Sequence, residues 1–275
     1  MKRPFILLVW LMVFWPLSPF AAEEKEGGII GTGVIGQITA LDQFAVSGMQ
    51  FDFAPDMEIV GVRGLEDLRI GMTLVLGTGR NGADWQIHSL RHMPLLSGPV
   101  TAPGEIMGVP IVGDLPSAGS FQIDGFWTDS GIVASRIVAS PDRTAQVSGT
   151  YNGRGMVGQV PVQSAELSAF SAGQTLTVRG IFQDGAIIAN SVEEGAFDGP
   201  TPGLVLLEGA YQTTDATDLV SLQGIAFASS NAEESVGSEG LVRHCAWNGR
   251  TDFLRNTLSA NEQEIVASFC ISATN

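Results

Sequence analysis

Basic residues are scarce in this chain of 275 residues, and lysine occurs only at Lys2 and Lys25. The 14 Lys and Arg residues stand against 29 Asp and Glu residues, so the formal net charge is −15. Proteins that bind nucleic acids neutralise phosphate groups with Lys and Arg. This charge balance argues against a nucleic-acid partner.

Charged residues of both signs make up only 16% of the chain, which is too few for a coiled coil. The 34 glycines have no three-residue period, so the chain is not collagen-like. After the N-terminus, no segment has the roughly 18 consecutive apolar residues that a membrane-spanning helix needs. We therefore expect no membrane span once the N-terminal segment is removed.

Motifs of common enzyme classes are absent as well. The chain has no Gly-x-Ser-x-Gly elbow, no phosphate-binding Walker loop and no His-Glu-x-x-His zinc motif. Residues 31–36 and 153–158 have the glycine spacing of a dinucleotide-binding loop, but no helical pattern follows either of them. We predict no catalytic residues and no cofactor. A hydrolase, the least favoured class, would need carboxylates from different parts of the chain.

The N-terminus has the three-part pattern of a secretory signal. Lys2 and Arg3 precede an apolar run over 5–15, and Ala21-Ala22 stands before two glutamates. We predict a signal peptide over 1–21 and a periplasmic or secreted protein, with export of the Gram-negative type; an uncleaved anchor is the alternative. Cleavage would leave 12 basic and 29 acidic residues, hence a net charge of 12 − 29 = −17.

Cysteine occurs only at Cys245 and Cys270. An even number of cysteines in an exported protein favours a disulfide, and we predict one between these two residues. Two buried thiols are the alternative.

Four glycine landmarks recur in the same order along the chain. The first follows an apolar residue and one other, at Gly36, Gly98, Gly149 and Gly209. The second and third open alternating apolar runs, at Gly48, Gly108, Gly158 and Gly224 and at Gly71, Gly119, Gly173 and Gly237. The fourth ends a dipeptide typical of hairpin turns, at Gly82, Gly131, Gly185 and Gly249.

The landmarks predict an all-β protein. Each copy has about five short strands. The edge strands of so small a sheet would leave backbone N–H and C=O groups unpaired, and closure into a barrel pairs them. We expect four tandem modules: module 1 (22–93), a short module 2 (94–143), module 3 (144–195) and, after a linker (196–204), module 4 (205–275) with a C-terminal extension. The only helical segments expected are one turn near 65–68 and a short helix near 252–258.

The order of the landmarks resembles the domain of unknown function 5666 family, bacterial exported proteins with repeated barrels. The match is best over Gly33–Arg91 and next best over Gln146–Glu194. The resemblance implies OB-like five-stranded barrels and a location outside the cytoplasm. It implies no catalytic residues and no ligand.

Neither histidines nor acidic clusters predict a metal site. His88 and His92 lie on a predicted strand about 13 Å apart, too far to share an ion, and we expect both to face solvent. Acidic residues gather at several places, and the loop 213–218 comes closest to a calcium loop. We interpret these residues as solvated surface charge and predict no metal.

An aromatic residue lies within four positions of the fourth landmark in every module: Trp85, Trp127, Phe182 and Trp247. Such a ring can stack on a ligand, as in OB folds. It can equally plug the barrel end or seal the contact with the next module, and recurrence in every copy favours that structural role.

Together these features predict a non-enzymatic envelope protein that acts as a binding or scaffolding module. Its partner would be another envelope protein or a glycan. The alternative is a protein that binds an oligosaccharide or another envelope ligand through the four aromatic residues.

Overall fold

The computed structural model describes residues 31–140, 144–197, 201–213, 219–222, 225–228, 241–247 and 260–271. The predicted signal peptide lies outside these residues, as do 214–218 of the calcium-like loop, the helix expected near 252–258 and the landmarks Gly224, Gly237 and Gly249. Strands dominate the described chain, so the all-β prediction is confirmed.

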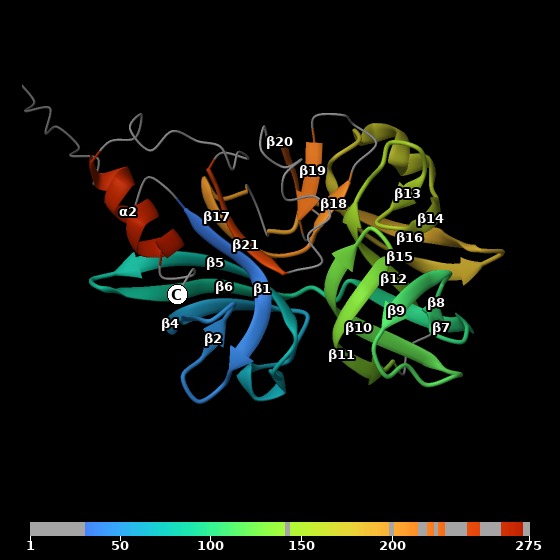
Figure 1. The fold of residues 1–275 in the computed structure, drawn as a ribbon, viewed down its shortest axis with the longest axis horizontal. Coiled ribbons are helices and arrows are strands. Elements are labelled where there is room, and N and C mark those ends of the chain that lie inside the picture. The colour runs from blue at the N-terminus through green and yellow to red at the C-terminus, as the bar shows by residue number, and fades with distance from the viewer. Residues whose placement is uncertain are drawn as a thin grey trace, which may run out of the picture.

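Modules 1 to 3 repeat one succession of strands (Figure 1). Module 1 contains β1 (Thr32–Ala40), β2 (Ala45–Val46), β3 (Met49–Gln50), β4 (Asp52–Val60), β5 (Thr73–Asn81) and β6 (Asp84–His92). Module 2 contains β7 (Leu96–Ala102), β8 (Glu105–Ile106), β9 (Val109–Val112), β10 (Ser120–Thr128) and β11 (Gly131–Ala139). Module 3 contains β12 (Ala145–Thr150), β13 (Met156–Val157), β14 (Val160–Gln163), β15 (Thr175–Gln183) and β16 (Ala186–Glu194).

The remaining strands are β17 (Leu204–Gly209), β18 (Tyr211–Thr213), β19 (Leu219–Leu222), β20 (Ile225–Ala228) and β21 (Val242–Trp247). The expected turn near 65–68 is the 3-10 helix η1 (Leu65–Asp67), and a second 3-10 helix, η2 (Ala165–Ala169), lies in module 3. The chain also forms an unpredicted helix, α2 (Ala260–Ile271). No helix of the described residues is both long and apolar enough to cross a bilayer.

The pairings within modules 2 and 3 return to the strand from which they start, and in module 1 the chain itself, through Phe51, links β3 to β4. In module 1, β1 pairs with β2 and β5, β2 pairs with β3, and β6 pairs antiparallel with β5 and parallel with β4. In module 2 the same succession runs β7, β8, β9, β11, β10 and back to β7. Module 3 repeats it from β12, where Tyr151 and Val157 form a single bridge to β13.

Two further pairings join modules to each other. The first strands of modules 2 and 3, β7 and β12, pair antiparallel at Leu96↔Val147. The first strand of module 1, β1, pairs in parallel with β17, which starts at the last residue of the predicted linker. The sheets therefore run on from module 1 into module 4 and from module 2 into module 3 (Figure 1).

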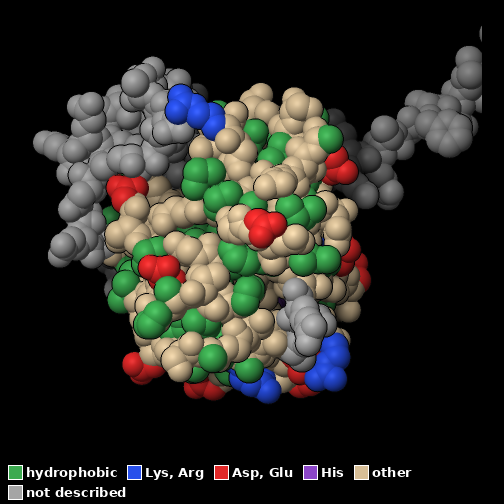
Figure 2. All heavy atoms as spheres, turned by 90° about the vertical axis from the view of Figure 1, so that its right-hand side faces the viewer, with side chains coloured by type: hydrophobic (Ala, Val, Ile, Leu, Met, Phe, Trp, Pro, Cys, Tyr) green, Lys and Arg blue, Asp and Glu red, His purple; other side chains and the backbone are tan. Residues whose placement is uncertain are grey.

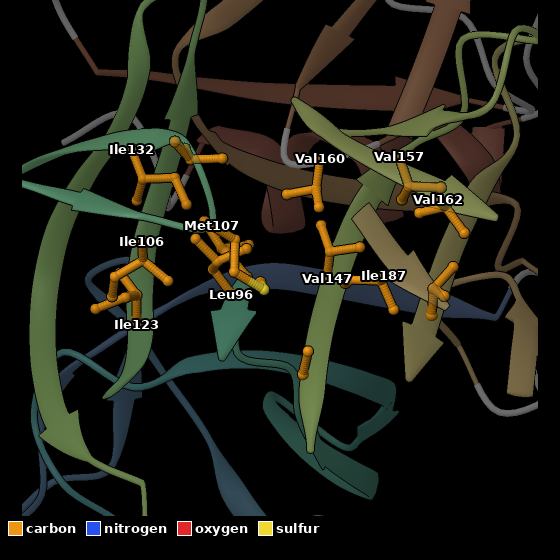
Figure 3. Packing of buried hydrophobic residues seen from close by; sticks show 14 of the residues in the cluster. Leu96, Ile106, Met107, Ile123, Ile132, Val147, Val157, Val160, Val162 and Ile187 are labelled. Carbon is orange, nitrogen blue, oxygen red and sulfur yellow. The ribbon is translucent and has the colours of Figure 1, made fainter. Parts of the chain in front are cut away.

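Apolar side chains of modules 2 and 3 meet in one buried cluster at the centre of this pair. Figure 3 shows two groups within it, each between the strands of its own module. The module 2 group has Leu96, Ile106, Met107, Ile123 and Ile132, and the module 3 group has Val147, Val157, Val160, Val162 and Ile187. A separate cluster fills module 1 and includes Val266 and Phe269 of α2.

The predicted disulfide is confirmed. Cys245 of β21 and Cys270 of α2 are bonded, with their Cα atoms 5.9 Å apart. The bond fastens α2 to the sheet against which the helix packs.

Candidate ligand-binding cleft

Module 1 carries an open cleft of about 460 Å³. Its walls are the loop between β1 and β2, the segment that joins β3 to β4, and the turn between β5 and β6. A cleft of this volume falls within the range of small-ligand sites.

Aromatic rings form the inner surface of the cleft. Phe44, Phe51 and Trp85 line it and are each at least nine-tenths buried. Phe53 is half-buried, and its ring centroid lies 4.8 Å from that of Phe44, within the range of favourable aromatic pairs. Phe44, Phe51 and Trp85 belong to the core of module 1, so each exposes only a small part of its ring to the cleft.

Polar side chains surround this floor. Gln50 Nε2 donates a hydrogen bond of 2.7 Å to Gln43 Oε1. This bond links the end of β3 to the loop between β1 and β2. The exposed carboxylates of Asp42, Asp52 and Asp84 also line the cleft, and its lining contains no Lys, Arg or His.

Trp85 is held from behind by α2. Its ring meets that of Phe269 at a centroid distance of 4.7 Å and an angle of 65°. The Arg80 guanidinium lies 6.0 Å from the Trp85 ring centroid and pairs with Glu264 at 3.2 Å. The sequence pattern singled out Trp85 but carried no signal for these partners, because α2 is about 180 residues further along the chain.

The arrangement suits a ligand with an apolar face and several hydroxyl groups. Carboxylate and amide oxygens accept hydrogen bonds, the amide nitrogens donate them, and the aromatic floor receives C–H groups. Phe44, Gln43 and Gln50 were not predicted as site residues. Their only signal was their position on either side of the second landmark, Gly48.

Trp127 lies elsewhere, at the contact between modules 2 and 3. It is 1% exposed, and its indole N–H donates to the carbonyl oxygen of Ser148 at 2.8 Å. This ring seals the contact with the next module, one of the two roles that the recurrence suggested.

Phe182 and Trp247 differ from Trp127 in their surroundings. Phe182 is half-buried and lines a second cleft, of about 500 Å³, with residues of modules 2 and 3. The backbone of Trp247 ends β21 opposite Leu204, and its side chain lies outside the described part of the structure. The four aromatic residues therefore do not share one site.

The expectation that both histidines face solvent is wrong for His92. His88 is exposed, but His92 is buried beside Asp124 of module 2, 2.8 Å from its Oδ1. Strand alternation was a poor guide because β6 contains a register shift opposite Gly77 and Thr78, which changes the side that its last residues face. Within the described ranges no three or more His, Cys, Asp or Glu side chains form a group that could hold a metal ion.

Comparison of the chain with models of protein families, with curated proteins and with solved structures finds no match.

Proposed function

We propose that this chain is an exported, non-enzymatic binding protein built from tandem OB-like barrels, and that the cleft of module 1 binds an oligosaccharide. The cleft supports the proposal, because its lining combines aromatic side chains anchored in the core with amide and carboxylate groups.

The pairing of strands supports the OB-like part of the proposal. In an OB fold, ligands bind at strands 2 and 3 and at the loops between strands 1–2 and 4–5. The corresponding parts of module 1 are β2 and β3, the loop 41–44 and the turn 82–83, and all but β2 contribute lining residues to the cleft. The resemblance to the domain of unknown function 5666 family belongs to the same proposal.

The charge of the cleft favours a saccharide over the other ligands of OB folds. Asp42, Asp52 and Asp84 would repel the phosphates of an oligonucleotide. The same carboxylates accept hydrogen bonds from sugar hydroxyls, which carry no charge. Export to the periplasm or beyond completes the proposal, and the Cys245–Cys270 disulfide is consistent with an extracytoplasmic protein.

An array of envelope-type oligosaccharides tests the function, and calorimetry with any hit tests the site. We expect Gln50→Ala and Asp84→Asn to weaken binding at least tenfold, since the first removes an amide group and the second removes a charged acceptor at the rim of the cleft. Asp114→Asn is the matched control, because Asp114 is exposed and lies outside the cleft. Silence across the array contradicts the saccharide, and binding that both cleft variants retain contradicts the site.

A scaffolding role in the envelope is the second candidate. The pairings β1–β17 and β7–β12 support it, because they make the modules into extended sheets rather than loosely strung units. Cross-linking of the chain in the envelope fraction, followed by mass spectrometry, tests this role. Reproducible cross-links from residues outside the module 1 cleft to one envelope protein would support it, and cross-links to the chain itself alone would contradict it.

A further inference from the structure

The second cleft belongs to a site that occurs twice in the molecule. The first strands of modules 2 and 3 pair antiparallel, with the equivalent residues Leu96 and Val147 opposite each other. This pairing relates the two modules by an approximate two-fold axis. Each module therefore presents the turn of its second hairpin (between β8 and β9 or between β13 and β14) to an aromatic ring of the other module.

One of the two sites is filled by Trp127. A Cβ atom on Gly158, in the turn between β13 and β14, would lie 2.6 Å from Cζ2 of the indole. A Cβ atom on Gly149 would lie 3.3 Å from its Nε1. The ring fits only because two glycines of module 3 leave the space for it, and the Ser148 carbonyl accepts its N–H.

The other site has a different occupant. Phe182 is the module 3 residue equivalent to Trp127. It pairs with Ile187 across its hairpin, as Trp127 pairs with Ile132. In module 2, Met107 stands at the turn position of Gly158. Its sulfur would lie 2.5 Å from a Cβ atom on Gly98, so Met107 itself covers the glycine that corresponds to Gly149. Figure 3 shows Met107 beside Leu96 within the module 2 group.

As a result, no ring of module 3 enters the second site. Phe182 stays half-buried at the side of the open cleft of about 500 Å³. Met107, Pro161 and Phe182 supply the apolar lining, and Thr101, Glu105 and Gln159 supply polar groups. Figure 2 looks onto the end of the molecule formed by modules 2 and 3, where hydrophobic side chains lie among scattered acidic ones.

We propose that this cleft binds a single flat aromatic ring that carries an N–H or O–H group, such as an indole. Two observations point to this class. Phe182 and Met107, which line the cleft, are partners that aromatic rings prefer. The Glu105 carboxylate can accept the polar hydrogen at the ring edge.

The polar groups already in use limit what else can bind. Thr101 Oγ1 accepts a hydrogen bond from the Gly108 N–H at 2.9 Å, and Gln159 Nε2 donates to the Thr128 carbonyl at 2.7 Å. These bonds hold the two turns and use the Gln159 amide nitrogen, whereas its Oε1 remains an acceptor. Glu105 is the charged acceptor of the lining, so we expect it to contribute most to the selection of a hydrogen-bond donor on the ligand.

Titration of the whole chain with indole, followed by NMR of ¹³C-labelled methionine methyl groups, tests the proposal. The Met107 signal, assigned with Met107→Leu, should shift and saturate. Phe182→Trp should abolish this shift, because the larger side chain fills the cleft from within. Phe170→Ala should leave it unchanged, since Phe170 packs on the same core but does not line the cleft.

Glu105→Ala gives a second test, which does not require a larger side chain to fill the cleft. This variant should bind indole at least threefold more weakly. Its affinity for 1-methylindole, which has no N–H, should be unchanged. N-acetyl-L-tryptophanamide and a short tryptophan peptide then separate a free aromatic molecule from a peptide side chain as the source of the ring. The proposal is overturned if indole produces no saturable shift of Met107 up to its solubility limit, or if Phe182→Trp binds as the natural chain does.

Discussion

His92 Nε2 and Asp124 Oδ1 lie 2.8 Å apart, and the two side chains are 5% and 0% exposed. His92 ends β6 of module 1, and Asp124 lies on β10 of module 2. The same carboxylate accepts the backbone N–H of Thr73 at 3.1 Å and Nη1 of Arg136 at 3.2 Å. One buried acid thus fastens modules 1 and 2 to each other.

Replacement of Asp124 should destabilise the protein strongly. Asp124→Ala leaves the Thr73 N–H, His92 and the Arg136 guanidinium without their shared acceptor. We expect a loss of about 3–5 kcal/mol in the free energy of unfolding, the range for one broken partner of a buried ion pair. Urea denaturation measures it. Asp114→Ala, at an exposed position, should change stability by less than about 0.5 kcal/mol, and equal effects of the two variants would refute the bridging role of Asp124.

Gly158→Ala should disturb the contact between modules 2 and 3. The new Cβ atom would lie 2.6 Å from Trp127, and the backbone at this position has a φ of 55°. We expect a loss of about 1–3 kcal/mol from overpacking and a red shift of Trp127 fluorescence as the ring is displaced.

Gly104→Ala is the control for this prediction. Gly104 also has a positive φ, of 79°, but a Cβ atom there meets nothing within 4 Å. Only the backbone cost of about 1–2 kcal/mol for a left-handed residue with a side chain should appear, without a change in fluorescence. A Gly158→Ala protein with native emission would contradict the tight seating of Trp127.

Reduction of the Cys245–Cys270 disulfide should loosen α2 from module 1. The chain-entropy model assigns roughly 3 kcal/mol to a loop of this size. Because Phe269 packs against Trp85, we also expect the fluorescence of Trp85 to shift to the red with dithiothreitol, and this shift should be missing in Trp85→Phe. An identical melting temperature with and without reductant would show that the bond adds nothing to stability.

The pair of Tyr211 and His244 should make stability depend on pH at both ends of the range. The two side chains are hydrogen-bonded, and burial raises the pKa of Tyr211 and lowers the pKa of His244. A histidine with a lowered pKa in the folded state takes up its proton more readily when unfolded. Stability therefore falls as the pH drops below about 6.5, and for the tyrosine it falls as the pH rises above about 10.

Denaturation at pH 5, 7 and 8 tests the acidic end of this dependence. We expect His244→Asn to lose less stability than the natural chain between pH 7 and pH 5. A parallel loss in both proteins would assign the acid sensitivity to other groups.

Local patterns carried most of the information on secondary structure. The Asn-Gly and Asp-Gly dipeptides at Gly82 and Gly185 lie at hairpin turns. Both glycines have a positive φ, which is favourable because glycine has no side chain. The helix α2 escaped prediction, because its apolar residues follow no clear helical stripe and its stability comes from packing on module 1 and from the disulfide. Only long-range contacts reveal such an element.

The candidate site was less predictable than the fold. Trp85, Trp127 and Phe182 look alike in the sequence, each a ring near a turn glycine. Their roles differ because Trp127 packs over two glycines, Phe182 lines a cleft together with Met107, and Trp85 packs against α2.

The alternation of strands and turns, the repeat and the expectation of a disulfide could be read from the amino-acid sequence, since each depends on residues close together or on a count. Which modules share a sheet, which polar side chains are buried and where the surface is hollow became visible only in the folded chain. These features arise from contacts between residues tens to hundreds of positions apart, and their geometry is set only when the whole chain packs.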